Sequence, residues 1–446
     1  MWGFTVDDAL ISIRYARHLR EGAGWVFNPG GPSTDGVTPL PWPLLLAPIA
    51  GADAFAALGT VKALGVVAAA ATGAIVGDAL SRGTSPVPLR VAILAAMACV
   101  LPAAAYASSG METPFAMLLV ALAAARLDAG HARTATVIGG LAVTLRPELA
   151  PWAAVVGFGA PPPHADPARS IARRVGFAAI ALSPFAACTV LRLAVWGSPV
   201  PLALRAKPSD LSHGFVYAGA VLLVSVAPVL LLAPGAWARA APSARALMLA
   251  GCTHILAMIA VGGDWMPYGR LVVPVLPALF IAAGRVAEIS RARWSWIRLV
   301  VACALGAASL VRAGPQGRHV TQDRRELGER LRRASLGAQR IATLDIGWVG
   351  AALPGAEIVD LAGVTDPEIA ALPGGHTSKR VDATMLLARR VDHVLFYRPA
   401  EASAFGRAVE VRLAASDLFR ARYREGGFIP LGDGAAGYVV FEIAPP

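Results

Sequence analysis

The stretch Phe4-Thr5-Val6-Asp7-Asp8-Ala9 places two adjacent carboxylates just ahead of about ten apolar segments. Charge is costly beside lipid, so acidic groups at such places are usually kept for function. Similar motifs return at the ends of later segments, as Ser109-Gly110-Met111-Glu112, Arg146-Pro147-Glu148 and Gly262-Gly263-Asp264-Trp265. We therefore expect these carboxylates to gather along one face of a membrane bundle, where they handle a polar substrate.

The composition is that of a polytopic α-helical membrane protein. Of 446 residues, 56% are hydrophobic and 15% are charged, and the mean hydropathy is +0.57. The formal charge of +11 comes mainly from arginines between apolar segments, so loop topology explains it and no nucleic-acid partner is expected. The four cysteines lie inside apolar runs, without the spacing of a disulfide framework or a zinc site.

The membrane segments are predicted from runs of apolar residues after a short interfacial piece at Leu40–Ala50. Two of the runs are short and meet at Arg146-Pro147-Glu148, which predicts a helix broken in mid-membrane. The predicted segments are residues 60–80, 89–107, 113–128, 135–147, 149–160, 173–195, 214–234, 246–262, 271–287 and 297–312.

Arginines in alternate loops predict the orientation, because positively charged loops stay in the cytoplasm. The opposite loops then carry all the acidic motifs to the extracytoplasmic side, and residues 1–40 lie there without a preceding span. We therefore expect a further helix upstream of Met1. The arginines used are Arg82, Arg90, Arg126, Arg133, Arg169, Arg173, Arg174, Arg239, Arg245, Arg291, Arg293 and Arg298.

The C-terminal part has a different pattern. Residues 313–446 open with a charged helix-like stretch at Arg318–Arg333, and short apolar runs then alternate with a helical pattern at Val381–Arg390. This alternation predicts a small soluble α/β domain. The predicted strands are Arg340–Asp345, Glu357–Leu361, His393–Tyr397 and Gly437–Ile443. The predicted plan is thus a membrane module at 1–312, with an extracytoplasmic loop at 1–40, followed by this domain.

The candidate catalytic residues are Asp7 and Asp8. Acidic residues in the first turn of a helix interact favourably with the helix dipole, but capping the N-terminus of the helix needs only one of the two aspartates. The second carboxylate fits a general base, a metal ligand or an acceptor of sugar hydroxyls.

Three cations are candidates for holding a phosphate: Arg146, Lys207 and Arg270. Two roles are open for Arg146. It binds a phosphate while Glu148 serves as its structural partner, or it only forms an internal ion pair with Glu148. Lys207 follows Trp196-Gly197-Ser198-Pro199-Val200-Pro201, so it fits an interfacial anchor or a lipid-phosphate contact.

Glu112, Glu148, Asp264 and Trp265 are candidates for contacts with sugar or acceptor. Glu112 also fits a helix cap. An aromatic belt at the membrane surface explains Trp265 and Tyr268 but neither Asp264 nor Arg270. His254, inside a span, is expected to be a packed core residue.

The ordered set of motifs resembles the AftB-like arabinofuranosyltransferases of mycobacterial cell-wall synthesis, over nearly the whole chain. The motifs that carry the resemblance are Thr5–Ala16, Gly24-Trp25-Val26-Phe27-Asn28-Pro29-Gly30, Ser109–Pro114, Leu145–Glu148, Gly197–Pro201 with Lys207, Gly262–Pro267 with Arg270, Asp345-Ile346-Gly347-Trp348, and Val359-Asp360-Leu361-Ala362-Gly363-Val364-Thr365-Asp366.

The resemblance implies a GT-C membrane glycosyltransferase in the bacterial plasma membrane. Such an enzyme takes a sugar from a polyprenyl-phosphate donor and passes it to a cell-surface glycan acceptor outside the membrane. Arabinofuranose is one candidate for the sugar, and its identity stays open. No cofactor is required; a divalent metal at Asp7 and Asp8 is allowed. Two other functions stay open, a polar-lipid transporter or flippase and a non-catalytic cell-envelope assembly protein.

Overall fold

The chain forms two compact units in the computed structural model, which describes residues 1–160, 166–207, 210–231, 233, 235–334, 339–399, 405–432 and 434–445. Unit 1 comprises Met1–Phe4, Lys62–Val190 and Ser209–Arg318. Unit 2 comprises Thr5–Val61, Leu191–Pro208 and His319–Pro446.

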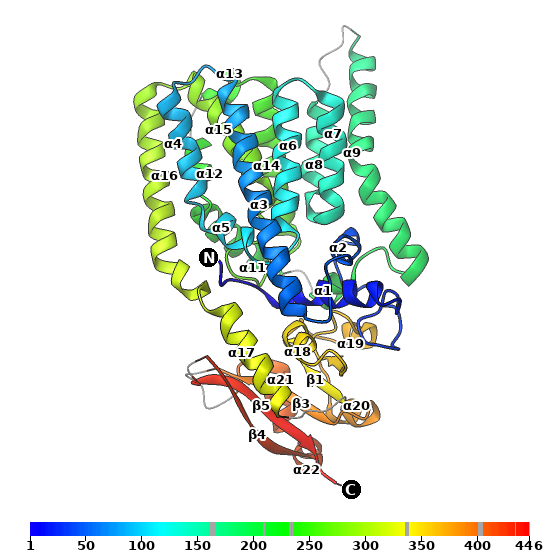
Figure 1. Ribbon diagram of the computed structural model, residues 1–446. Coiled ribbons are helices and arrows are strands. Elements are labelled where there is room, and N and C mark those ends of the chain that lie inside the picture. The colour runs from blue at the N-terminus through cyan, green and yellow to red at the C-terminus, as the bar shows by residue number, and fades with distance from the viewer. Residues whose placement is uncertain are drawn as a thin grey trace. The chain divides into compact units, whose positions relative to one another are not determined.

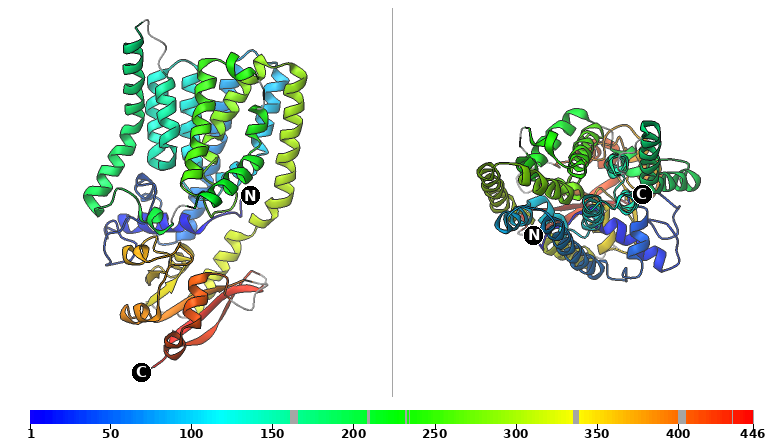
Figure 2. Two further views of the ribbon diagram at one scale, coloured as in Figure 1. Left: turned by 180° about the vertical axis from the view of Figure 1, so that it is seen from behind. Right: turned by 90° about the horizontal axis from the view of Figure 1, so that it is seen from above.

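Unit 1 is built from helices that run alongside one another (Figures 1 and 2). Several begin with a proline in their first turn, where the missing N–H costs nothing. Its helices are α3 (Ala54–Ser81), α4 (Val87–Ala98), α5 (Leu101–Ala107), α6 (Thr113–Asp128), α7 (Ala132–Leu145), η1 (Pro147–Leu149), α8 (Ala150–Gly159), α9 (Pro167–Trp196), α11 (Leu211–Val224), α12 (Ala227–Leu231), α13 (Ala236–Arg239), α14 (Pro242–Ala260), η2 (Val273–Val275), α15 (Leu276–Ile289), α16 (Ala292–Ala313) and η3 (Gly314–Gly317); α3 and α9 extend into unit 2.

Within the described residues, 4 helices are long and apolar enough to cross a membrane: Ala54–Ser81, Pro167–Trp196, Pro242–Ala260 and the continuous Ala292–Arg333. A fifth span results if α4 and α5, bent by 63°, are counted together. The other predicted segments are helical but shorter. The predicted break in mid-membrane is wrong in its form. The helix α7 ends at Leu145, Arg146 is extended (φ −139°, ψ 90°), and after η1 the chain returns as α8, which packs beside α7 (Figure 1), so the motif Arg146-Pro147-Glu148 is a turn between two helices.

The two ends of unit 1 differ in their charged groups. At one end, Arg285 of α15 binds Asp128 of α6 (2.6 Å) and donates to the Ala79 carbonyl of α3 (2.8 Å). At the other end, Arg146 after α7 binds Glu112 before α6 (2.8 Å). Because the helices cross the unit alternately, the loops predicted to be cytoplasmic share the first end, and the turns that carry Glu112, Glu148 and Asp264 share the second (Figure 1).

Unit 2 contains a five-stranded sheet of order β2-β1-β3-β5-β4. The β2–β1–β3 part is parallel, and β5 and β4 are antiparallel to their neighbours. The elements of this unit are α1 (Asp7–Arg20), α2 (Pro41–Leu46), α10 (Leu202–Ala206), α17 (Val320–Arg333), β1 (Arg340–Thr343), α18 (Ile346–Ala352), β2 (Glu357–Asp360), α19 (Pro367–Ala371), α20 (Ala383–Ala388), β3 (His393–Arg398), α21 (Ala408–Ala415), α22 (Asp417–Arg422), β4 (Tyr423–Leu431) and β5 (Ala436–Ile443).

The sequence predicted one boundary, at residue 313, between the membrane module and the C-terminal domain. In the structure, unit 2 also includes two earlier segments, Thr5–Val61 and Leu191–Pro208. The N-terminal segment, predicted as a loop of the membrane module, shares a core with the C-terminal domain: Ile11, Tyr15 and Phe27 pack with Ile341 and Leu395. The cause is the apolar face of α1, which a solvent-exposed loop helix would leave uncovered.

The four predicted strands correspond to β1, β2, β3 and β5, and the predicted helix at Val381–Arg390 contains α20. Sequence reasoning missed β4. This edge strand contains Gly426, Gly427 and Pro430, residues that weaken a strand pattern, and its pairing is irregular between Glu425 and Gly427.

The orientation predicted from the loop arginines leads to a labelling experiment. Cysteines introduced at Met266 and Asp417 in a cysteine-free background should react with a membrane-impermeant maleimide on intact cells, whereas one at Ala241 should react only after lysis. Labelling at Ala241 on intact cells, without labelling at the other two sites, would reverse the predicted orientation.

Candidate functional site

Unit 1 brings together five of the residues singled out from the sequence. Arg146 binds Glu112 through Nη1 (2.8 Å) and Glu148 through Nε (2.9 Å), and Arg270 binds Asp264 through Nε (2.8 Å). Glu112 lies within electrostatic range of both arginines. We call these five residues the charged cluster.

The charged cluster is largely out of reach of solvent. The side chains of Glu112 and Arg146 are 1% and 3% exposed, and even Glu148 is only 14% exposed. Burying such charges is costly unless each is paired, so the ion pairs are a condition of this arrangement. Within the described residues, Nη2 of Arg146 and Oε2 of Glu112 are buried without a hydrogen-bond partner. Such orphan atoms indicate a place for water or a polar ligand.

The loop that carries Asp264 and Arg270 has an unusual backbone. Gly262, Gly263 and Gly269 have positive φ, and so does Tyr268 (φ 62°), a conformation that costs a bulky residue roughly 1–3 kcal/mol. The Tyr268 hydroxyl donates to the Ala313 carbonyl (2.9 Å). The surrounding contacts thus hold a strained loop in place, as is typical of functional sites.

Two predicted residues near this loop have contrasting environments. Trp265 is 64% exposed, and its ring stacks on His213 with the centroids 4.3 Å apart. His254 is fully buried, and its ring nitrogens contact the carbonyls of Glu148 (3.1 Å) and Leu271 (2.8 Å). His254 is therefore a packed residue, as the sequence predicted, while Trp265 presents an aromatic face to its surroundings.

In unit 2, Asp7 opens α1 and caps another helix. Its Oδ2 accepts the Gly347 N–H (2.9 Å) and its Oδ1 accepts the Trp348 N–H (2.7 Å), both in the first turn of α18. A Cβ on residue 347 would lie 2.2 Å from the backbone carbonyl oxygen of Asp7. Residue 347 must therefore be glycine for the starts of α1 and α18 to lie this close together. Asp8 is the next residue of α1 and is partly exposed.

Behind Asp7 lies a buried polar network that sequence reasoning did not assign. Asp345, just before α18, accepts two hydrogen bonds from Nη2 of Arg407 (2.8 and 2.9 Å) and one from the Tyr438 hydroxyl. Arg407 also binds Glu410 (3.4 Å). The signal available in the sequence was the motif Asp345-Ile346-Gly347-Trp348; the partners of Asp345 lie more than one element away and have no local signature.

The two aspartates of this region titrate as a pair. Burial raises the pKa of Asp7, and the nearby charge of Asp345 raises it further. Burial would also raise the pKa of Asp345, but Arg407, Arg324 and the Tyr438 hydroxyl together lower it. The pKa of Asp7 is thus raised and that of Asp345 is lowered, so Asp7 is the first of the two carboxyl groups to bind a proton as pH falls.

The predicted site residues thus fall into two groups. The charged cluster and Trp265 belong to unit 1, while Asp7, Asp8 and Lys207 belong to unit 2. Lys207 follows α10 and is partly buried. Among the described residues, no group of three or more His, Cys, Asp or Glu side chains could hold a metal ion.

Glu410 provides a test of the buried network. Burial is the largest cause that raises its pKa, to about 7, from roughly 4.3 in an unfolded chain. The folded state therefore binds this proton more tightly, and the free energy of unfolding falls as pH rises from about 4 to about 7. The Glu410→Gln variant lacks this titration, so its stability relative to the parent should increase across that window.

The measurement is the thermal unfolding midpoint of parent and variant in detergent at about pH 5 and about pH 8. Glu329→Gln, the same change on an exposed ion pair of α17, is the control and should show a constant difference. A constant difference for Glu410→Gln as well would contradict the account of the buried network.

No model of a known protein family matches the chain, and no curated protein or solved structure matches it.

Proposed function

We propose that this chain is a membrane glycosyltransferase. It moves a sugar, with arabinofuranose as the first candidate, from a polyprenyl-phosphate donor to a cell-surface glycan acceptor at the extracytoplasmic side of a bacterial plasma membrane. The observation that supports this most is the state of Arg146. Its Nη1 donates a hydrogen bond to Glu112 and its Nε forms an ion pair with Glu148, while its buried Nη2 has no hydrogen-bond partner among the described residues.

A phosphate oxygen suits that nitrogen. Arginine donates charge-assisted hydrogen bonds in a planar fork, and an arginine already oriented by Glu112 and Glu148 loses little freedom on binding. Arg270, oriented in the same way by Asp264, is the second proposed phosphate contact, and Lys207 is the third. In the reaction they neutralise the negative charge that develops on the leaving phosphate.

The two carboxylates of α1 divide the remaining work in this proposal. Both oxygens of Asp7 are engaged by backbone N–H groups, so Asp7 positions the first turn of α1. Asp8 then acts as general base: it takes the proton of an acceptor hydroxyl, the oxygen bonds to the anomeric carbon, and the bond from that carbon to the phosphate oxygen breaks. Polyprenyl phosphate leaves with the electron pair. Glu112, Glu148, Asp264 and Trp265 orient the cations or contact the sugar.

The division between the acids predicts two different outcomes. Asp8→Asn keeps the shape of the side chain but removes the base, so transfer should fall by roughly 100-fold or more while the protein folds and inserts. Asp7→Asn keeps one acceptor oxygen and should cost as much or less. Rates of labelled sugar transfer, with unfolding midpoints as the folding control, check both variants. Parental rates in both would make the acidic pair structural.

The role of Arg146 predicts a loss that a matched arginine does not show. Arg146→Lys keeps the charge but removes the fork, and losing one charged hydrogen bond to the donor should raise the donor KM by roughly tenfold or more. Arg285 is the control, because two carboxylates, Asp128 and Glu288, also hold it. Arg285→Lys should leave the donor KM unchanged at a similar cost in stability. Equal effects of the two substitutions on donor KM would remove the phosphate-binding role.

A further inference from the structure

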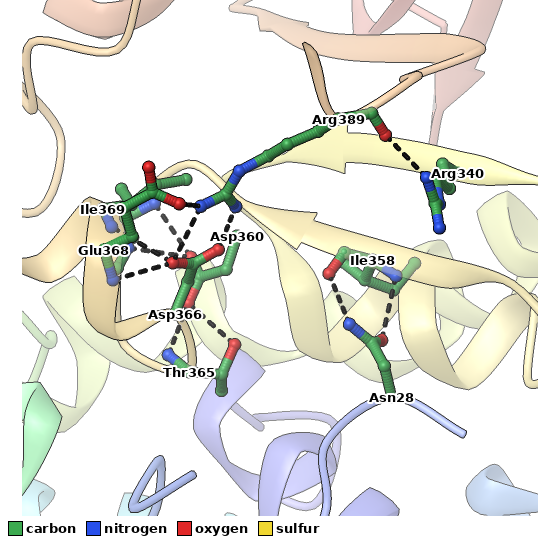
Figure 3. A network of polar contacts seen from close by, with 11 residues as sticks. Asn28, Arg340, Ile358, Asp360, Thr365, Asp366, Glu368, Ile369 and Arg389 are labelled. Carbon is green, nitrogen blue, oxygen red and sulfur yellow. Dashed lines mark hydrogen bonds and ion pairs between the residues drawn. The ribbon is translucent and has the colours of Figure 1, made fainter. Parts of the chain in front are cut away.

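Unit 2 contains an open groove of about 510 Å³ along the edge strand β2 (Figure 3). This volume lies within the range of small-molecule sites, roughly 300–1,000 Å³. Two sequence motifs from opposite ends of the chain line it: residues 27 and 28 of the Gly24–Gly30 motif, and Val359, Thr365 and Asp366 of the Val359–Asp366 motif. Neither motif has a role in the proposed transfer step.

The N-terminal wall of the groove also closes the sheet. The side-chain amide of Asn28 donates to the Ile358 carbonyl (2.8 Å), and its oxygen accepts the Ile358 N–H (2.9 Å). Arg14 holds this segment through a bond from Nε to the Phe27 carbonyl (2.7 Å). Because Asn28 occupies the backbone groups at the open edge of β2, an added peptide strand would find them already taken.

The C-terminal wall is built around Asp360. Its carboxylate accepts the N–H groups of Ala362 (2.8 Å), Gly363 (3.1 Å) and Thr365 (2.6 Å) and the Thr365 hydroxyl (3.0 Å). Gly363 has φ +75°, and a Cβ there would lie 2.5 Å from the Ala370 nitrogen. The turn then delivers Asp366 to the start of α19, where it accepts the N–H groups of Glu368 and Ile369 (both 3.1 Å). The motif thus forms a rigid wall.

The charges of the groove are paired and nearly balanced. Arg340 binds Glu357 (2.6 Å), and Arg389 binds both Asp366 and Glu368. Two cations face three carboxylates, so a phosphate or another anion would meet net repulsion. Paired carboxylates and guanidinium groups instead present alternating acceptors and donors, which match the hydroxyl groups of a neutral sugar. The exposed rings of Pro32 and Pro367 add apolar surface for its C–H faces.

We propose that this groove binds a neutral oligosaccharide and that, given the transfer reaction proposed above, this oligosaccharide is the acceptor glycan. The groove holds the acceptor chain through hydroxyl contacts with Asp366, Glu368 and Arg389. It therefore contributes to acceptor KM and leaves the chemical step and donor binding to other residues.

The test uses the full chain in detergent and measures binding of a neutral arabinofuranose hexasaccharide by titration calorimetry, alongside acceptor KM in the transfer assay. Pro32→Trp fills the groove without removing an N–H, and Glu368→Gln removes one exposed carboxylate. Each should weaken hexasaccharide binding and raise acceptor KM by roughly tenfold, with donor KM unchanged. The matched controls outside the groove, Pro373→Trp and Glu329→Gln, should change neither quantity.

The outcomes separate the groove from the proposed reaction. Hexasaccharide binding that the groove variants weaken, in a protein without transfer activity, would support the groove and count against the glycosyltransferase. Transfer with parental binding and acceptor KM in both groove variants would overturn the groove and leave the reaction standing. Tighter binding of an oligogalacturonate than of the neutral hexasaccharide would also overturn the assignment, because the ligand would then be an anion.

Discussion

The carboxylate of Asp7 joins the first helix of the chain to the C-terminal sheet domain. Its two oxygens accept hydrogen bonds from the N–H groups of Gly347 and Trp348. About two helical turns further along α1, Arg14 donates hydrogen bonds to the carbonyls of Gly350 (2.8 Å) and Ala356 (2.7 Å). Each hydrogen bond from the charged Arg14 contributes about 1.5–3 kcal/mol, so this set stabilises unit 2 substantially. The position of Asp8, of the Asn28 segment and of the groove all depend on it.

Unit 1 depends on a different balance. Arg146 and Arg270 are buried with three carboxylates, and removing one partner of a buried pair typically costs roughly 3–5 kcal/mol because a charge is left unpaired. Well-packed apolar residues would be as stable or more so. Such a cluster therefore adds little to the stability of the fold. This favours a functional reason for the charges at the ends of apolar helices.

Much of this arrangement could be predicted from local sequence. The apolar runs predicted the helices of unit 1, Arg146-Pro147-Glu148 predicted that a helix ends there, and short apolar runs predicted four of the five strands. Alternate crossing of the helices then brings Glu112, Glu148 and Asp264 to one end of unit 1.

The remainder depends on contacts that no local pattern records. The bond between residues 7 and 347 spans nearly the whole chain, and the pairing of Asp345 with Arg407 and Tyr438 requires the sheet to be assembled first. For the same reason, the boundary predicted at residue 313 missed the shared core of α1 and the sheet. The pairing of Asn28 with the backbone of Ile358 could not be predicted either, because the two residues lie 330 positions apart in the sequence.

The proposed activity is the transfer of a sugar from a lipid phosphate. The most direct measurement incubates the purified protein with a neutral glycan acceptor and a polyprenyl-phosphate arabinofuranose carrying a radiolabelled sugar, and in parallel with the corresponding nucleotide sugar. We expect a labelled glycan from the lipid donor alone, with one polyprenyl phosphate released per sugar transferred. Transfer from the nucleotide sugar with none from the lipid donor would contradict it.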